Sequence, residues 1–301
     1  MHQPRSHRFA FPALILANLV LAVGPWMVRL ARTEAHIGPV AAGFWRMGLA
    51  APFLILLAWR QDGGRPLPRW PLIAAIAVGG LFFAADLAAW HAGILRTRLA
   101  NATLFGNFAS FLFAIYGLVL IRSLPSRVQA AALALAAFGT ALLLGRSFEL
   151  SREHFAGDLL AMLAGVFYTF YLIAVDRARQ SMAPLPVLAI ATAAGAIPLL
   201  ILALQIGEQV MPDDWTPVIL LALSSQLIGQ GLLVYAMGHQ PPLVVGLCFL
   251  TQPVAAAAVG WAAFGERLTA VDIGGALLIC AALVLIRLPG RGLASNPLEA
   301  Q

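Results

Sequence analysis

Two charged residues lie in the middle of long apolar runs. Arg46 is within the run 37–59, and Asp86 is within the run 70–94. A charge at the centre of a bilayer costs about 3 kcal/mol on insertion scales, so such residues usually face a cavity or a partner. Two interpretations compete. Either a buried pair, or pairing to backbone carbonyls, holds adjacent helices together, or Arg46 attracts a carboxylate while Asp86 meets an ammonium group or carries a proton.

Other polar and aromatic residues follow helical spacing near the same depth. Asp86 and Trp90 are four residues apart, and Gln226 and Gln230 repeat that spacing in a later apolar run. Residues four apart share one face of a helix. Trp90 follows Asp86 on that face and is the best candidate for an aromatic wall, which suits a ligand with an apolar side chain.

The same depths recur when the chain is compared with itself. At an offset of 144 residues, Asp86 falls on Gln230 and Asn107 falls on Thr251. Matched polar groups in symmetry-related helices fit a central cavity, although interhelical hydrogen bonds worth about 0.6–2 kcal/mol are the simpler use of each residue. The candidate binding residues are Arg46, Asp86, Trp90, Asn107, Gln226, Gln230 and Thr251.

The sequence lacks the usual signatures of enzymatic or metal chemistry. There is no His-Glu-x-x-His, no metal-ligand spacing and no phosphate-cradling glycine loop. Ser224-Ser225 has no nucleophile-elbow context, and Cys248 and Cys280 lie in apolar runs as small core residues. We therefore expect no cofactor, no metal and no catalytic activity.

Composition identifies the environment of these residues. The chain has 301 residues, of which 61% are hydrophobic and 11% charged, with a mean hydropathy of +0.86. Soluble domains are about 45–50% apolar and about 25% charged, so this chain cannot be soluble or disordered. A net charge of +6, carried entirely by arginine on the basic side, does not indicate a nucleic-acid partner in so apolar a chain.

Ten apolar runs are long enough to cross a bilayer, which takes about 20 residues per helix. The first is too long for the apolar part of a signal peptide, so we expect it to be retained as a span. The connectors are too short for a soluble domain. The ten runs are 9–31, 37–59, 70–94, 97–121, 125–146, 154–177, 184–206, 215–238, 241–264 and 269–287.

Arginine placement predicts the orientation of the chain. Ten spans put both termini on one side, and with the termini inside, the inner segments hold eleven arginines and the outer segments seven. Positively charged residues favour cytoplasmic segments. The sequence thus predicts a multi-pass protein of the bacterial inner membrane with cytoplasmic N and C termini.

The two halves of the chain resemble each other weakly. An offset of 147 pairs Arg32 with Arg179 and Pro39 with Pro186. We predict two five-helix repeats, residues 1–150 and 151–301, and an odd number of spans forces the second to insert upside down. Inverted repeats with a site at their interface are a transporter design.

One segment contains sequence motifs that are more specific than the internal similarity. Residues 249–286 contain Phe-Leu-Thr-Gln-Pro-Val, a Gly-Glu-Arg-Leu-Thr exit and an Ile-Gly-Gly start to the last span. This resembles the ninth and tenth spans of the EamA-like branch of the drug/metabolite transporter superfamily, and Pro39 with Phe44-Trp45-Arg46 resembles its second span. The first half departs from the pattern, since Ala109 and Arg122 stand where the second half has Pro253 and Glu266. The resemblance implies a ten-helix exporter, closest to exporters of aromatic and neutral amino acids.

Together these observations predict an all-α polytopic membrane protein that exports small metabolites, amino acids foremost, by alternating access around a central cavity. Arg46 or Asn107 would meet the carboxylate, Asp86 the ammonium and Trp90 the side chain. The partners expected are the substrate and the lipid bilayer. Proton coupling would use Asp86, and the spacing of Ala256 and Gly260 permits close helix packing or a homodimer contact.

Two rival functions remain open from the sequence. Sugar phosphates are dianions that should need several cavity cations, whereas only Arg46 lies deep in a span. A polytopic membrane enzyme would need clustered catalytic residues facing one surface, and a scaffold would not need matched polar groups at mid-depth. Both are less favoured than amino-acid export.

Overall fold

The computed structural model describes residues 7–62, 69–97, 99–122, 124–145, 153–264 and 269–287. Within these ranges all regular structure is helical, including one π-helical segment, and no strand occurs. This confirms the all-α architecture. The expected division at residue 150 and the side chains of Ala256 and Gly260 lie outside what is described.

The first half of the chain forms five membrane-crossing segments, two of which are made of two helices in line. These helices are α1 (His7–Leu21), α2 (Gly24–Thr33), α3 (Pro39–Asp62), α4 (Trp70–Ile94), α5 (Leu99–Gly106), α6 (Phe108–Leu120) and α7 (Arg127–Gly145).

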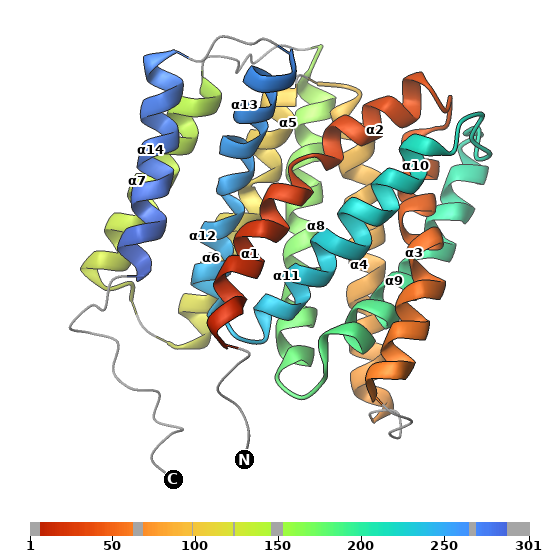
Figure 1. The fold of residues 1–301 in the computed structure, drawn as a ribbon, viewed down its shortest axis with the longest axis horizontal. Coiled ribbons are helices and arrows are strands. Elements are labelled where there is room, and N and C mark those ends of the chain that lie inside the picture. Colours follow the sequence, from red (N-terminus) through yellow and green to blue (C-terminus); the bar gives the residue numbers. More distant parts are fainter. Residues whose placement is uncertain are drawn as a thin grey trace.

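The second half also forms five segments, of which the third and fourth are composite. Its elements are α8 (Phe155–Arg179), α9 (Pro184–Gln205), α10 (Thr216–Leu221), the π-helix η1 (Ala222–Gly229), α11 (Gln230–Met237), α12 (Pro242–Phe249), α13 (Thr251–Phe264) and α14 (Ala270–Arg287). In Figure 1, α1 begins and α14 ends at the same edge of the bundle, as an even number of crossings requires.

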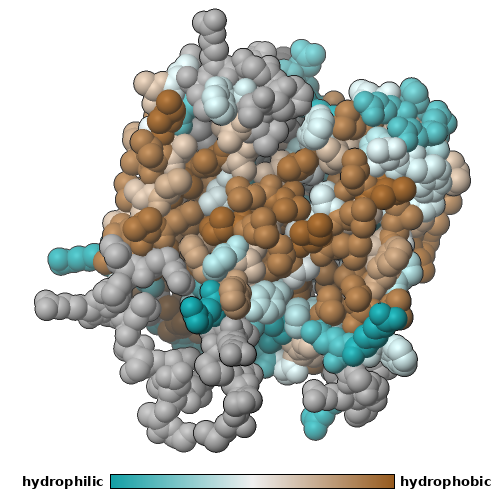
Figure 2. Space-filling view, viewed as in Figure 1, coloured by the Kyte–Doolittle hydropathy of each residue, from teal (hydrophilic) through white to brown (hydrophobic). Residues whose placement is uncertain are grey.

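The helices have the length and composition needed to cross a membrane. In the described part of the chain, seven continuous segments are long and apolar enough, and three shorter apolar helices cover 127–142, 242–255 and 270–286. These coincide with the ten runs expected from hydropathy. Figure 2 shows the result on one face, where a hydrophobic band crosses the molecule between two hydrophilic edges. The protein is a polytopic membrane protein.

Helix contacts follow the pattern that an approximate two-fold relation between the halves demands. α3 packs on α9, α6 on α12 and α7 on α14, so three segments contact their own counterparts. α4 packs on α8, and the counterpart contact is made by α1 with η1 and α11. The weak sequence similarity between the halves thus corresponds to a real relation between their packing.

Two related segments are interrupted at matching depths. The fourth segment breaks at Asn107, between α5 and α6, and the ninth breaks at Leu250, between α12 and α13. Both residues lie in turns without a proline at the break itself. Each break changes the direction of the side chains beside it. The two interrupted segments can therefore present polar groups to the interior of the bundle.

Small residues allow the central helices to approach closely. A Cβ on Gly80 would collide with the Ala191 backbone carbonyl, and one on Gly195 would lie 2.7 Å from the Gly80 carbonyl oxygen. α4 and α9 therefore cross with their backbones in contact. Packing of this kind replaces the hydrophobic effect as the force between helices in lipid.

Two reciprocal helix caps join α3 and α9 at opposite edges of the bundle. Glu208, which follows α9, accepts a hydrogen bond from the Ala41 backbone N–H at 2.8 Å in the first turn of α3. Gln61, at the end of α3, accepts one from the Leu185 backbone N–H at 3.4 Å in the first turn of α9. The residues 61 and 208 are 147 apart, so this pair of caps follows the repeat offset.

Candidate functional site

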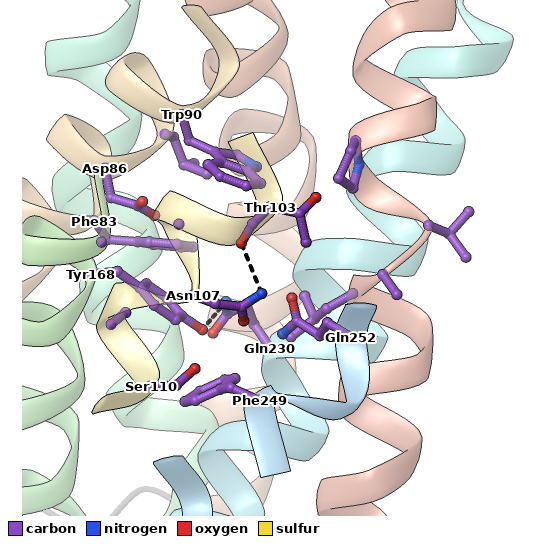
Figure 3. Close-up of a pocket in the computed structure, with 18 of the residues that line it drawn as sticks. Phe83, Asp86, Trp90, Thr103, Asn107, Ser110, Tyr168, Gln230, Phe249 and Gln252 are labelled. Carbon is purple, nitrogen blue, oxygen red and sulfur yellow. Dashed lines mark hydrogen bonds between the residues drawn. The ribbon is translucent and has the colours of Figure 1, made fainter. Parts of the chain in front are cut away.

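A cavity of about 460 Å³ lies inside the bundle, within the range of about 300–1,000 Å³ usual for small-molecule sites. Seven of the ten membrane segments contribute to its wall, and Figure 3 shows much of the lining. The lining residues are Leu21, Ala22, Val23, Pro25, Trp26, Arg29, Arg46, Phe83, Asp86, Leu87, Trp90, Thr103, Gly106, Asn107, Ala109, Ser110, Gly165, Tyr168, Gln230, Phe249 and Gln252.

Five of the seven candidate residues from the sequence line this one cavity, namely Arg46, Asp86, Trp90, Asn107 and Gln230. The other two do not. Gln226 is fully buried behind the wall, and the Thr251 hydroxyl donates to the Cys248 carbonyl at 2.7 Å, where it caps the end of α12.

Arg46 is held in the wall by a chain of buried amide and hydroxyl groups. Its Nε donates to Gln226 Oε1 at 3.2 Å, and Gln226 Nε2 donates to Thr192 Oγ1 at 2.9 Å. The guanidinium also lies over the Phe83 ring, 5.5 Å from its centroid. Neither Nη atom has a hydrogen-bond partner among the described residues, so both remain for a ligand.

Asp86 lies on the cavity wall without a direct counter-charge. In the described ranges no cation approaches its carboxylate within 4.0 Å, and none of the hydrogen bonds there involves it. The buried Arg46–Asp86 ion pair that the sequence left open is therefore not formed. The cavity instead presents one positive and one negative group separately.

Gln230 is fixed by two tyrosines of α8. The Tyr171 hydroxyl donates to Gln230 Oε1 at 3.2 Å, and Gln230 Nε2 donates to the Tyr168 hydroxyl at 3.1 Å. Tyr171 is fully buried, and Gln230 is its hydrogen-bond acceptor. Because the Tyr168 oxygen accepts from Gln230, the Tyr168 proton is left to donate toward the cavity.

Aromatic rings form the apolar part of the wall. Five rings from four segments take part: Trp26, Phe83, Trp90, Tyr168 and Phe249. Trp90 packs against Gly106, where a Cβ would collide with its indole ring. Tyr168 meets Phe249 edge-on, with the ring centroids 5.7 Å apart. A flat or branched apolar side chain would find contact surface on several sides.

The cavity has one open and one closed end. At the end near α2, the wall includes Trp26, which is 40% exposed, and the exposed Arg29. At the other end it finishes at Ser110 and Phe249, both almost fully buried. The exposed residues of the lining therefore lie toward the edge of the bundle at which α3 and α8 begin, and the buried ones lie toward the opposite edge.

Sequence reasoning missed several wall residues. Tyr168, Gln252, Ser110, Phe83 and Phe249 line the cavity but are not among the candidates from the sequence. Gln252 and Phe249 flank the break at Leu250, and Ser110 follows the break at Asn107. The usable signal was the pair of matched breaks, but neither break has a proline at its own position, and the break at Leu250 has no glycine there either.

Comparison with known families settles what kind of protein has this fold and cavity. The sequence model of the EamA-like transporter family matches twice, over residues 8–145 and 155–288. The chain belongs to the EamA-like transporter family. EamA-like proteins are small-molecule transporters rather than enzymes, and this member is a multi-pass protein of the lipid bilayer.

A solved structure agrees with the EamA-like fold. A chain described only as "Crystal structure of protein" matches with a TM-score of 0.79 at 18% identity, over 95% of this chain and 100% of that chain. At that identity the similarity supports the fold and says nothing about the substrate. The search of curated proteins gave no match.

Proposed function

We propose that this EamA-like protein exports α-amino acids with aromatic or other apolar side chains. The observation that carries the proposal is the separation of charges in the wall. Arg46 and Asp86 line one cavity of about 460 Å³ without forming an ion pair. A zwitterion can form a direct ion pair with each group at once, whereas an anion or a cation alone would leave one of them without a direct partner.

The remaining lining suits the other parts of such a substrate. The carboxylate would meet the Nη atoms of Arg46 and the proton of Tyr168, and the ammonium would meet Asp86. The side chain would pack among Trp26, Trp90 and the other rings of the wall. Arg29, the second arginine of the wall, is exposed at the mouth, so a dianionic sugar phosphate would find one interior cation.

The shape of the cavity supports transport by alternating access. The site is open at one edge and closed by Ser110 and Phe249 at the other, and the two halves pack with an approximate two-fold relation. Exchanging the conformations of the halves would close the open end and open the closed one. We place the protein in a bacterial inner membrane with both termini in the cytoplasm, on the distribution of arginines.

Counterflow in proteoliposomes tests the substrate class. Vesicles loaded with unlabelled phenylalanine, leucine, a nucleoside or a sugar phosphate would be supplied with the labelled compound outside. We expect accumulation of the two amino acids alone. Failure to accumulate any amino acid would overturn this proposal, and accumulation of the sugar phosphate would transfer the assignment to that class.

Charge variants test the site. Arg46→Gln and Asp86→Asn should each reduce counterflow about 100-fold, since each leaves one ligand charge buried without its partner, a loss of about 2–3 kcal/mol. Arg60→Gln is the matched control, because Arg60 is an exposed arginine on the same helix as Arg46 and lies off the cavity. Wild-type rates in both cavity variants would remove those residues from the site.

Proton coupling would depend on Asp86, the carboxylate of the described wall. An inward proton gradient should then drive substrate out of wild-type vesicles against its own gradient. Asp86→Asn should abolish this response to pH even where residual counterflow remains. Uphill transport by wild type that ignores the proton gradient would assign coupling to another source.

A further inference from the structure

The side-chain amides around the cavity have orientations that chemistry dictates. An amide presents two N–H donors at one end and an acceptor oxygen at the other. A backbone carbonyl can only accept, so an amide that bonds to one must turn its nitrogen toward it. Tracing these obligatory partners shows which end of each amide is left for a ligand.

Asn107 presents an acceptor to the cavity. Its Nδ2 donates to the Thr103 carbonyl oxygen at 2.8 Å, one helical turn earlier. This bond is drawn in Figure 3, where Asn107 lies in the middle of the lining. Its Oδ1 takes no hydrogen bond from the described residues. The sequence allowed Asn107 to bind a carboxylate, but an exposed amide oxygen would repel one and attract an ammonium group.

Gln252 presents an acceptor as well, through a relay of two amides. Asn18 is fully buried and donates through Nδ2 to the Leu14 carbonyl oxygen at 2.8 Å, so its Oδ1 is an acceptor. Gln252 Nε2 donates to that Oδ1 at 2.9 Å. The nitrogen of Gln252 is thereby directed at α1, and its Oε1 remains for the cavity that Gln252 lines.

We propose that Asn107 and Gln252 are specificity-determining residues which, with Asp86, recognise a primary ammonium group by accepting its N–H hydrogen bonds. The proposal rests on the zwitterionic substrate proposed above and adds a selection that charge alone does not make. A primary ammonium has three N–H donors, two of which the amide oxygens would accept while Asp86 supplies the opposite charge. A trimethylammonium group has the same charge and no donor, so it would leave both amide oxygens desolvated and unpaired.

Competition between matched ligands tests the selection. Displacement of labelled phenylalanine from the purified protein would be measured with phenylalanine, α-methylphenylalanine, N-methylphenylalanine and N,N,N-trimethylphenylalanine. The α-methyl compound adds bulk while keeping all three N–H donors. In wild type we expect the trimethyl compound to bind at least about 100-fold more weakly than the α-methyl compound, because each hydrogen bond to a charged group is worth about tenfold or more.

Variants assign that ratio to the two amides. Gln252→Met and Asn107→Leu keep side-chain size and remove the acceptor, and each should lower the ratio about tenfold. Asn18→Leu leaves Gln252 in place but removes the atom that orients it, so it should also lower the ratio. This third variant preserves the test if a substitution at the wall prevents folding, and Arg60→Gln should retain the wild-type ratio.

The outcomes separate this inference from the proposed function. Absence of phenylalanine binding to wild type would overturn both. Binding of phenylalanine with equal affinity for the α-methyl and trimethyl compounds would overturn the selection of primary ammonium groups alone. A full wild-type ratio in Gln252→Met and Asn107→Leu would likewise overturn the role of the amides and leave Asp86 as the recognising group.

Discussion

The two walls of the cavity are built from related helices but are anchored differently. On one side, α8 packs against α4, α5 and α6, and polar bonds tie it near both ends. Asp158 accepts from Thr97 at 2.6 Å and from Asn101 at 3.1 Å, and Tyr116 donates to Asp176 at 3.2 Å near the other end. On the other side, α1 packs against η1, α11, α12 and α13. There Gln252 donates to Asn18 at the height of the cavity, and after the end of α2 the chain is tied to the loop before α10, where the Asp213 N–H donates to the Ala35 carbonyl at 3.1 Å.

This difference indicates which wall moves. The α1–α2 side contains the interruption at Ala22–Val23 and carries the mouth residues Trp26 and Arg29. α1 can tilt about its bond to Gln252 because the interruption separates it from α2, whereas α8, held near both ends, moves as one body with its neighbours. We therefore expect α8 with α5 and α6 to form the fixed side, and α1–α2 to open and close the mouth.

The largest effect should come from releasing the α8 wall at Asp158. Asp158→Ala leaves the Thr97 hydroxyl and the Asn101 amide buried without their acceptor. We expect a loss of about 3 kcal/mol in the free energy of unfolding, measured by thermal unfolding in detergent. An unchanged melting temperature would show that this side is not anchored as described.

A smaller loss of stability with a large loss of transport should follow Gly106→Ala. The added Cβ would collide with the Trp90 ring, and because α5 lies on the fixed side, the indole rather than the helix should shift. Overpacking costs about 1–3 kcal/mol. Counterflow should fall at least about tenfold while folding is retained. Normal transport would mean that α5 shifts and the Trp90 indole keeps its position.

The loss of a hydrogen bond should have different effects on the two sides of the cavity. Tyr116→Phe removes one described bond, and Asn18→Leu removes the bond to the Leu14 carbonyl and the bond from Gln252, at a cost of about 1 kcal/mol for each bond. Hydrogen exchange should distinguish them. Asn18→Leu should speed amide exchange throughout α1 and α2, while Tyr116→Phe should change α8 only near its end. Equal effects on both walls would contradict the assignment of a moving side.

The smallest effect concerns the caps of α3 and α9, which flank both walls. Partial burial raises the pKa of Glu208, despite its hydrogen bond from the Ala41 N–H. The folded protein then holds this proton to higher pH than the unfolded chain, so stability falls as pH rises from about 4.5 through the raised pKa. Glu208→Gln should flatten this slope and keep the cap, as Gln61 does at the related position.

The check for that variant is the melting temperature between pH 4 and pH 8. The matched control is Glu34→Gln, since Glu34 is an exposed carboxylate just after α2. A slope that persists in Glu208→Gln, or that vanishes in Glu34→Gln, would assign the pH dependence to other groups.

Local features of the chain were sufficient to predict the membrane fold. Hydropathy is a property of each segment by itself, so all ten crossings could be located before any packing was known. The same holds for Arg46 and Asp86, because a charge within an apolar run is visible without its neighbours. Five of the seven candidate residues line the cavity: these two charges, and Trp90, Asn107 and Gln230, which were found by helical spacing and by the offset between the halves.

The spacing of these residues in the sequence could not predict their hydrogen-bond partners. Gln226 and Gln230 are four apart, but Gln226 lies in the π-helix and bonds to Arg46, while Gln230 follows it and bonds to two tyrosines. Thr251 and Gln252 are adjacent at a helix break, and only Gln252 lines the cavity. A π-turn or an unmarked break rotates every side chain near it, so the periodicity of an ideal helix fails at these places.

The sequence by itself determined that this protein crosses the membrane many times, that its halves are related and that one arginine and one aspartate lie at mid-depth. Only the tertiary structure decided that those two charges remain apart and that the amides beside them turn their oxygens inward. The physical reason is that hydrophobicity is summed along the chain. Which donor or acceptor of a side chain is left for a ligand depends instead on the hydrogen bonds that its other atoms form, and these involve residues of other helices and turns.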